Sequence, residues 1–90
     1  MPYIDKDKRA EILHYNDHTE LITIDLDYIQ CAGDFNFLVS TLISMYIERE
    51  GESYKVHNEL IGFLECAKLE LYRRHTARLE DEKIRINGDI

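Results

Sequence analysis

Residues 53–78, SYKVHNELIGFLECAKLELYRRHTAR, decide the fold because they predict one long helix. Ser53 suits the N-cap, where its hydroxyl can accept a hydrogen bond from a backbone N–H that would otherwise be unpaired. No proline interrupts the run, and most residues between Glu59 and Arg74 favour helix. We therefore expect a single helix from residue 53 to residue 78.

This predicted helix is apolar on more than one side. At about 100° per residue, one face gathers six side chains and should meet the core of its own chain: Val56, Leu60, Phe63, Leu64, Ala67 and Leu71. A second strip, formed by Gly62, Cys66 and Leu69, lies on nearly the opposite side. A helix that is apolar on two sides is usually buried on two sides. In a chain of this size we expect another subunit to cover the second strip.

The C-terminal part of the same helix is basic. It carries Lys68, Arg73, Arg74 and Arg78, with Tyr72 among them. In the simpler interpretation these side chains lay their stems over the edge of the core and interact with the last carbonyls of the helix. In the alternative interpretation they form a cationic pocket, because arginine offers planar, bidentate donors to a carboxylate or a phosphate.

Composition indicates one small globular domain that gains from assembly. A chain of 90 residues buries only about 60–65% of its unfolded surface. Hydrophobic residues make up 44% and charged residues 32% of the sequence, which excludes a disordered chain. We expect a single domain over residues 1–90, with an arm at 1–4, helices at 34–50 and 53–78, and an acidic tail at 79–90.

The charge of the chain is uneven. The net charge is −7, and residues 1–54 alone hold four Lys and Arg against eleven Asp and Glu. Residues 55–78 are basic, with five Lys and Arg against three Glu. General DNA or RNA binding requires a broad basic surface, so this pattern disfavours it. A small anion could still bind on the basic end of the helix.

The N-terminal half predicts shorter elements. Tyr3 and Ile4 belong to an apolar arm that could dock on a neighbouring subunit, and residues 5–15 predict a short helix. Residues 16–19 predict a turn, and residues 20–29 alternate as in a strand, although we find no second strand to pair with it. The segment could pair with its own copy across a dimer, or it could be helical, so the pattern leaves strand and helix open.

A second long helix should begin at Asp34 and end before Gly51. Its inner face is expected to comprise Phe35, Leu38, Leu42, Met45 and Tyr46, widened by Phe37, Ile43 and Ile47. The short link at residues 51–53 predicts that the two long helices form an antiparallel hairpin. The expected fold is mostly α, with a short N-terminal helix and one short strand.

Four segments resemble a family of small uncharacterised proteins of tailed bacteriophages and prophages. They are MPYI at 1–4, GDFNFLVSTLI at 33–43, SYKVHNELIGFLECAKLELYRR at 53–74 and EDEKIRINGDI at 80–90. Residues 5–30 diverge from the pattern. The family's long helix usually ends in an apolar stretch and a proline, whereas this chain has HTARL at 75–79, so a break there is less expected. The resemblance implies no assigned activity, but it does imply a specific role for both chain ends.

Metal chemistry and nucleophilic catalysis find little support in the sequence. Helical nucleotide pyrophosphohydrolases hold Mg²⁺ with paired carboxylates, but Glu65 and Glu70 are five residues apart and point to different sides. His14 and His18 share helical spacing for zinc, yet a turn is expected between them. Cys66 has no histidine at productive spacing, so we expect Cys31 and Cys66 to be reduced and at least partly buried. No metal or cofactor is expected.

Two functional hypotheses follow, and neither is an enzyme. The first is a phage-type homo-oligomer that sequesters a small anion, such as a nucleotide immune signal, with Lys68, Tyr72, Arg73, Arg74 and Arg78. The second is an adapter or inhibitor of a host protein that uses the acidic N-terminal half. No signal peptide and no run of about 18 apolar residues marks secretion or insertion into a membrane, so we expect a cytoplasmic protein.

Overall fold

The computed structural model describes residues 4–89 and confirms a mostly helical fold. The chain divides into two compact units, Met1–Glu50 (unit 1) and Gly51–Ile90 (unit 2). The predicted antiparallel packing of the two long helices would join the units, and it stays a prediction.

Unit 1 begins with a short helix that ends earlier than the sequence suggests. Helix α1 spans Lys6–Ile12 and is capped by Asp5, whose carboxylate accepts a hydrogen bond from the Asp7 backbone N–H at 2.9 Å. The prediction that this helix continues to Tyr15 is wrong. Leu13 has extended dihedral angles, φ −130° and ψ 123°, and the chain passes directly into a strand. Pairing with a strand further along the chain outweighs the local helical pattern here.

The two strands of unit 1 form a hairpin. Strand β1 spans Leu13–Asn16 and strand β2 spans Leu21–Ile24, and they pair antiparallel with Tyr15 opposite Ile22. The predicted turn is therefore confirmed, and the strand expected over residues 20–29 is confirmed only at Leu21–Ile24, because a 3₁₀ turn follows it. The expectation that no partner strand exists was wrong. In the turn, the Asn16 side-chain oxygen accepts hydrogen bonds from the backbone N–H groups of His18 and Thr19. This local bonding is typical of asparagine in turns.

A 3₁₀ turn at Leu26–Tyr28 leads into helix α2, which spans Ala32–Glu50. The helix starts two residues before the predicted start at Asp34. Asp34 instead reaches back, and its carboxylate accepts a hydrogen bond from the Gln30 backbone N–H at 3.0 Å. The Lys8 ammonium of α1 lies 3.6 Å from the same carboxylate. Asp34 therefore ties α1 to the start of α2.

The core of unit 1 is small and surrounds the N-terminal half of α2. Ile12, Phe37 and Leu38 are buried together, and Ile4, Leu13 and Ile29 pack against them. The prediction placed Phe35 on the inner face, but Phe35 is 56% exposed and Phe37 takes its place. The two residues differ by about 200° around the helix, so the inner face is rotated from the predicted one.

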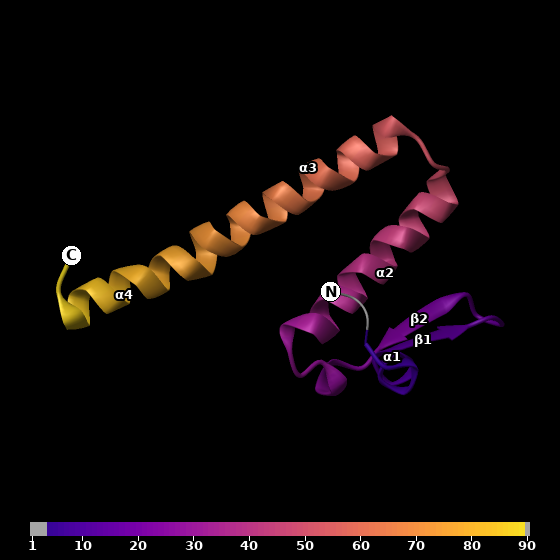
Figure 1. Cartoon of the computed structure of the whole chain (residues 1–90), viewed down its shortest axis with the longest axis horizontal. Coiled ribbons are helices and arrows are strands. Elements are labelled where there is room, and N and C mark those ends of the chain that lie inside the picture. The colour runs from indigo at the N-terminus through magenta and orange to yellow at the C-terminus, as the bar shows by residue number, and fades with distance from the viewer. Residues whose placement is uncertain (1–3, 90) are drawn as a thin grey trace. The chain divides into compact units, whose positions relative to one another are not determined.

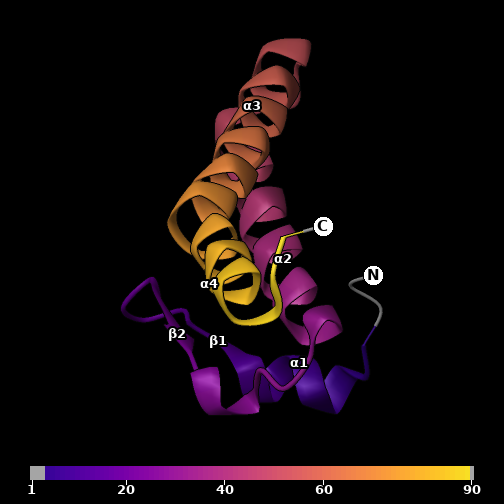
Figure 2. The same ribbon diagram turned by 90° about the vertical axis from the view of Figure 1, so that its left-hand side faces the viewer.

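Unit 2 is one continuous helical segment. Helix α3 spans Tyr54–Leu71, a π-helical turn follows at Tyr72–Thr76, and helix α4 spans Ala77–Asn87. The ribbon stays coiled from α3 to the end of α4 in both views (Figures 1 and 2). The predicted N-cap is confirmed, because the Ser53 hydroxyl accepts a hydrogen bond from the Val56 backbone N–H at 3.2 Å.

The helical segment extends beyond the predicted end at Arg78. Residues 79–87, expected as the start of an acidic tail, are helical. The helix stops at Gly88, which has φ 85° and closes the last turn through its N–H to the Ile84 carbonyl. A positive φ at this position favours glycine, so Gly88 is the stop signal. The sequence had left open whether residues 79–83 extend the helix or bend away, because HTARL stands where the family pattern has a proline.

The apolar residues of unit 2 are mostly exposed. Among its described residues only Val56 is buried, whereas Phe63, Leu64 and Leu71 of the predicted core-facing side are exposed. Their expected burial in the core of their own chain is therefore not observed. Over residues 4–89, no helix is both long and apolar enough to span a bilayer.

Candidate functional site

The predicted ligand-binding residues lie close together around the π turn. Lys68 is in the last turn of α3, Tyr72, Arg73 and Arg74 are in the π turn, and Arg78 is in the first turn of α4. They form a basic surface that runs around consecutive turns of one helical segment, which does not break between Leu71 and Ala77. At about 100° per residue, Lys68 lies more than 90° around the helix from Arg73 and Arg74, so the predicted residues are neighbours along the axis but do not share one face.

Each cation of this surface contacts an oxygen of its own helix. Glu70 accepts hydrogen bonds from Arg73 at 3.0 Å and from Arg74 at 2.6 Å. Lys68 lies 3.0 Å from Glu65, and Arg78 donates to the Arg74 backbone carbonyl at 3.4 Å. The spacing of three or four residues is that of ordinary ion pairs on a helix surface.

Electrostatics reinforce these pairs. The guanidinium of Arg73, followed by that of Arg74, lowers the pKa of the Glu70 carboxyl below its usual range. At the other side of the turn, a hydrogen bond to Glu80 raises the pKa of the Tyr72 hydroxyl, and the nearby charges of Glu80 and Asp81 add to this effect. The Tyr72 hydroxyl therefore faces carboxylates, which disfavours an anion at that group.

The predicted interface residues fall in different places. Gly62, Cys66 and Leu69 are exposed along α3, and a Cβ atom added at Gly62 would meet no atom within 4 Å. Ile4 packs against the core of unit 1, and Tyr3 lies outside the described residues. Cys31 and Cys66 are both free and exposed, so their expected burial was wrong.

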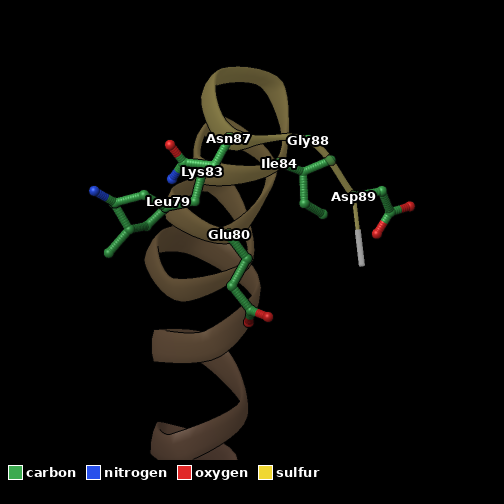
Figure 3. Close-up of a pocket in the computed structure, with 7 residues that line it drawn as sticks. All are labelled: Leu79, Glu80, Lys83, Ile84, Asn87, Gly88 and Asp89. Carbon is green, nitrogen blue, oxygen red and sulfur yellow. The ribbon is translucent and has the colours of Figure 1, made fainter.

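A hollow at the end of α4 was not anticipated from the sequence. Leu79, Glu80, Lys83, Ile84 and Asn87 line it together with Gly88 and Asp89. In the close-up, Leu79 and Lys83 extend to one side of the helix and Ile84 to the other (Figure 3). These side chains surround the helix end and do not converge on one point. The hollow lies beside the turn at Gly88.

Unit 1 has an open groove between the hairpin and the second half of α2. Tyr15, Met45, Glu48 and Arg49 line it. The Arg49 guanidinium lies 5.1 Å from the centre of the Tyr46 ring and pairs with Glu50 at 3.0 Å. Sequence reasoning missed this groove because it assigned Tyr15 to a helix and not to β1.

The described residues contain no group of three or more His, Cys, Asp or Glu side chains that could hold a metal ion. His14 lies in β1, and His18 lies in the turn after it, so the helical spacing considered for zinc does not apply. On α3, Glu59 and Glu65 pair with Lys55 and Lys68. These carboxylates serve as ordinary helix-surface partners.

Comparison with other proteins places the chain in a family. No curated protein matches it, and no solved structure matches it. A family described as a domain of unknown function, DUF6899, matches residues 1–90. The match covers every described element, from α1 to the turn after α4. The chain therefore belongs to the DUF6899 family, which agrees with the expectation of an uncharacterised family.

Proposed function

We propose that this chain is a non-enzymatic binding protein that assembles with copies of itself through α3. The observation that carries the proposal is the exposed apolar face of that helix, with Phe63, Leu64 and Leu71 aligned along it. Helices in proteins gain most of their stability from packing of an apolar face. An exposed face of this length is typical of a surface that another chain covers.

The energy available from this face is modest. Full burial of a large aliphatic or aromatic side chain contributes about 1.5–3 kcal/mol. Phe63, Leu64 and Leu71 are already about half buried, so covering the remainder contributes about 1 kcal/mol each, or about 6 kcal/mol for two copies. Association costs about 4–15 kcal/mol. Contact through α3 alone is therefore marginal, and a stable assembly requires additional apolar surface.

A pair of matched substitutions tests self-assembly. Leu64→Glu places a charge on the apolar face, and Ile61→Glu places the same charge at an exposed apolar position about 60° further round α3 from Leu64 and off that face. Native mass spectrometry and light scattering should find an oligomer for the wild type and for Ile61→Glu, and a monomer for Leu64→Glu. A monomeric wild type, or a Leu64→Glu variant that assembles normally, would contradict the proposal.

Besides copies of itself, the binding partner of this chain is a second protein. The helix end that could have formed an anion pocket carries ion pairs within one chain, which suits a flat protein-binding surface. Unit 1 holds four Lys and Arg against ten Asp and Glu, so its acidic surface complements a basic partner. In the phage setting that the resemblance implies, this partner would be a host protein.

Sequestration of a small anion is the second candidate function. The observation in its favour is that the paired side chains of Arg73 and Arg74 remain 68% and 65% exposed. Exposed ion pairs contribute little, so a nucleotide with two or more phosphates could displace Glu70. Its phosphates would take the guanidinium groups while its base stacks on Tyr72.

Titration with ATP tests the second candidate. Arg74→Ala should weaken ATP binding at least about tenfold, in line with the loss of a charge-assisted bond. Arg85→Ala is the matched control, because Arg85 also pairs with a helix glutamate, Glu82, but lies outside the basic surface. Equal ATP affinity in the wild type and Arg74→Ala, or no binding at all, would leave only the protein partner.

A further inference from the structure

The π turn between α3 and α4 changes which side chains share a face. Within Tyr72–Thr76 the backbone N–H of Ala77 bonds to the Tyr72 carbonyl, five residues back, and not to the carbonyl four residues back. Such a turn holds one more residue than an α-helical turn. Everything after it is therefore rotated back by about 100° relative to an uninterrupted α-helix.

This rotation brings the apolar residues of α4 into line with those of α3. In an uninterrupted α-helix, Leu79 and Ile86 would lie about 100° away from the centre of the apolar face of α3. With the extra residue they fall within about 10° of it. Leu79 is 59% exposed and Ile86 is 62% exposed, so both are available for contact.

We propose that α3 and α4 together form one continuous docking face for a second copy of this chain, which lies antiparallel and is centred near Leu71 and Tyr72. The inference deepens the proposed self-assembly and rests on it. The π turn is the feature that extends the face from α3 to α4, and the added residues supply the apolar surface that α3 alone lacks.

The apolar pattern suits a second copy because the face matches itself when reversed. Leu64 and Leu79 are nearly equidistant from the centre of the face, seven residues before Leu71 and eight residues after it. In an antiparallel pair, Leu64 of each copy therefore meets Leu79 of the other, and Leu71 of one copy meets Leu71 of the other. Both contacts, Leu64 with Leu79 and Leu71 with Leu71, place exposed aliphatic side chains against each other.

The charges select the antiparallel direction. Glu59 lies before the centre and Arg85 lies after it, at matching distances and on the same flank of the face. Reversal of one helix sets Glu59 of one copy beside Arg85 of the other. A parallel pair would instead hold the basic surfaces of both copies at one level, where like charges repel.

Insertion of one alanine after His75 tests the register across the π turn. The added residue rotates Leu79 and Ile86 by about 100° away from the face, whereas deletion of His75 turns the π turn into an α-helical turn and leaves both residues in line. The matched control is therefore the His75 deletion, which also changes the length of the turn but keeps the register. Sedimentation should give a dimer dissociation constant at least about 100-fold higher for the insertion than for the deletion. Circular dichroism on both proteins establishes that helix content is retained.

Cysteine cross-linking tests the direction of the pair without altering its length. In a background with Cys31→Ser and Cys66→Ser, one sample contains only Leu64→Cys chains, and another contains Leu64→Cys mixed with Leu79→Cys chains. In the antiparallel pair the two Leu64 positions are about 22 Å apart, beyond the ~7 Å that a disulfide allows between Cα atoms. Only the mixed sample should form covalent dimers under mild oxidation.

The outcomes separate this inference from the proposed function. A wild type that remains monomeric overturns both. A dimer of equal strength in the insertion and in the His75 deletion overturns the continuous face across the π turn and leaves self-assembly in place. Cross-linking in the sample with Leu64→Cys alone overturns the antiparallel direction. Loss of the dimer in the insertion but not in the deletion, with cross-links in the mixed sample alone, supports the inference.

Discussion

At the scale of single residues, Asp34 is the main polar support of unit 1. Its carboxylate is buried, accepts a hydrogen bond from the Gln30 N–H and lies beside the Lys8 ammonium. The backbone hydrogen bond from Gln30 and the charge of Lys8 lower the pKa of Asp34 despite the opposing effect of burial. The Lys8 ammonium also lies 5.7 Å from the centre of the Tyr28 ring. One lysine of α1 therefore contacts both the 3₁₀ turn and the first turn of α2.

The lowered pKa of Asp34 predicts a dependence of stability on pH. A carboxyl whose pKa is lower in the folded state than in the unfolded chain stabilises the fold above the unfolded pKa, about 3.9 for aspartate. This stabilisation is lost as the pH falls through the lower, folded pKa. We therefore expect the urea midpoint of the wild type to decrease below about pH 4 more steeply than that of Asp34→Asn.

The control for this measurement is Asp17→Asn, which makes the same change in the exposed turn of the hairpin. It should follow the pH profile of the wild type, while Asp34→Asn should have a lower midpoint at pH 7. Parallel profiles for the wild type and Asp34→Asn would show that Asp34 makes no such contribution.

Residue patterns were informative where a local bond decides the conformation. The cap at Ser53 and the turn around Asn16 follow from hydrogen bonds within three residues, and the sequence predicted both. The burial of Phe37 in place of Phe35 depends on where α1 and Ile29 pack. That contact involves residues distant in the sequence, which a helical pattern alone does not contain.

At the scale of elements, the clearest contrast is between the hairpin and the long helix. The helical pattern of residues 5–15 continues past Ile12, but β1 forms because β2 is available to pair with it. A single segment cannot reveal this competition. The start of the long helix was predicted well because the cap at Ser53 is a local signal, whereas its end was not, because the helical segment continues past Arg78 to Asn87.

The strip formed by Gly62, Cys66 and Leu69 gives a prediction for α3. It lies on a different side of the helix from Leu64 and Leu71, and all three of its residues are exposed. If this strip forms a second contact, Cys66→Arg should reduce assemblies larger than a dimer to the dimer, because a long cation at the centre of a contact keeps the two surfaces apart.

Native mass spectrometry under reducing conditions measures this effect, with Ile61→Arg as a control at an exposed position of α3 that lies outside the strip. An unaltered mass distribution for Cys66→Arg would remove the strip as an interface. A wild type that forms only dimers would do the same.

At the scale of the whole molecule, the two units differ in what stabilises them. Unit 1 has its own core, in which Ile12 is 0% exposed. The described part of unit 2 buries only Val56, so its stability under the proposed function depends on a second chain. Stability that depends on association varies with protein concentration.

This difference predicts two kinds of unfolding behaviour. Thermal unfolding followed by circular dichroism should contain a component that moves to higher temperature as protein concentration rises, due to unit 2. Ile12→Ala should destabilise the other component by about 2–4 kcal/mol without altering the first. Ile24→Ala, at a partly exposed position of β2, is the control and should cost less. A single transition independent of concentration would contradict the prediction.

The positions of the candidate site residues along the helix could be predicted from the sequence, but their ion-pair partners could not. Sequence position alone places Lys68, Arg73, Arg74 and Arg78 on neighbouring turns. Which carboxylate each cation meets depends on side-chain geometry, and the structure pairs Arg73 and Arg74 with the single carboxylate of Glu70. The π turn has no such signal, because its residues, YRRHT, are compatible with an α-helix.

The π turn also has a consequence for how this family can vary over evolutionary time. One residue inserted between Leu71 and Leu79 would rotate everything that follows, whereas loss of one residue would turn the π turn into an α-helical turn and keep the register. The link at residues 51–53 can absorb either change in length. Selection acting on the assembled form would therefore tolerate substitutions and the loss of one residue within 72–76 but remove insertions there. Aligned family members should either share this spacing or lack one residue across the turn, and differ more freely in length elsewhere.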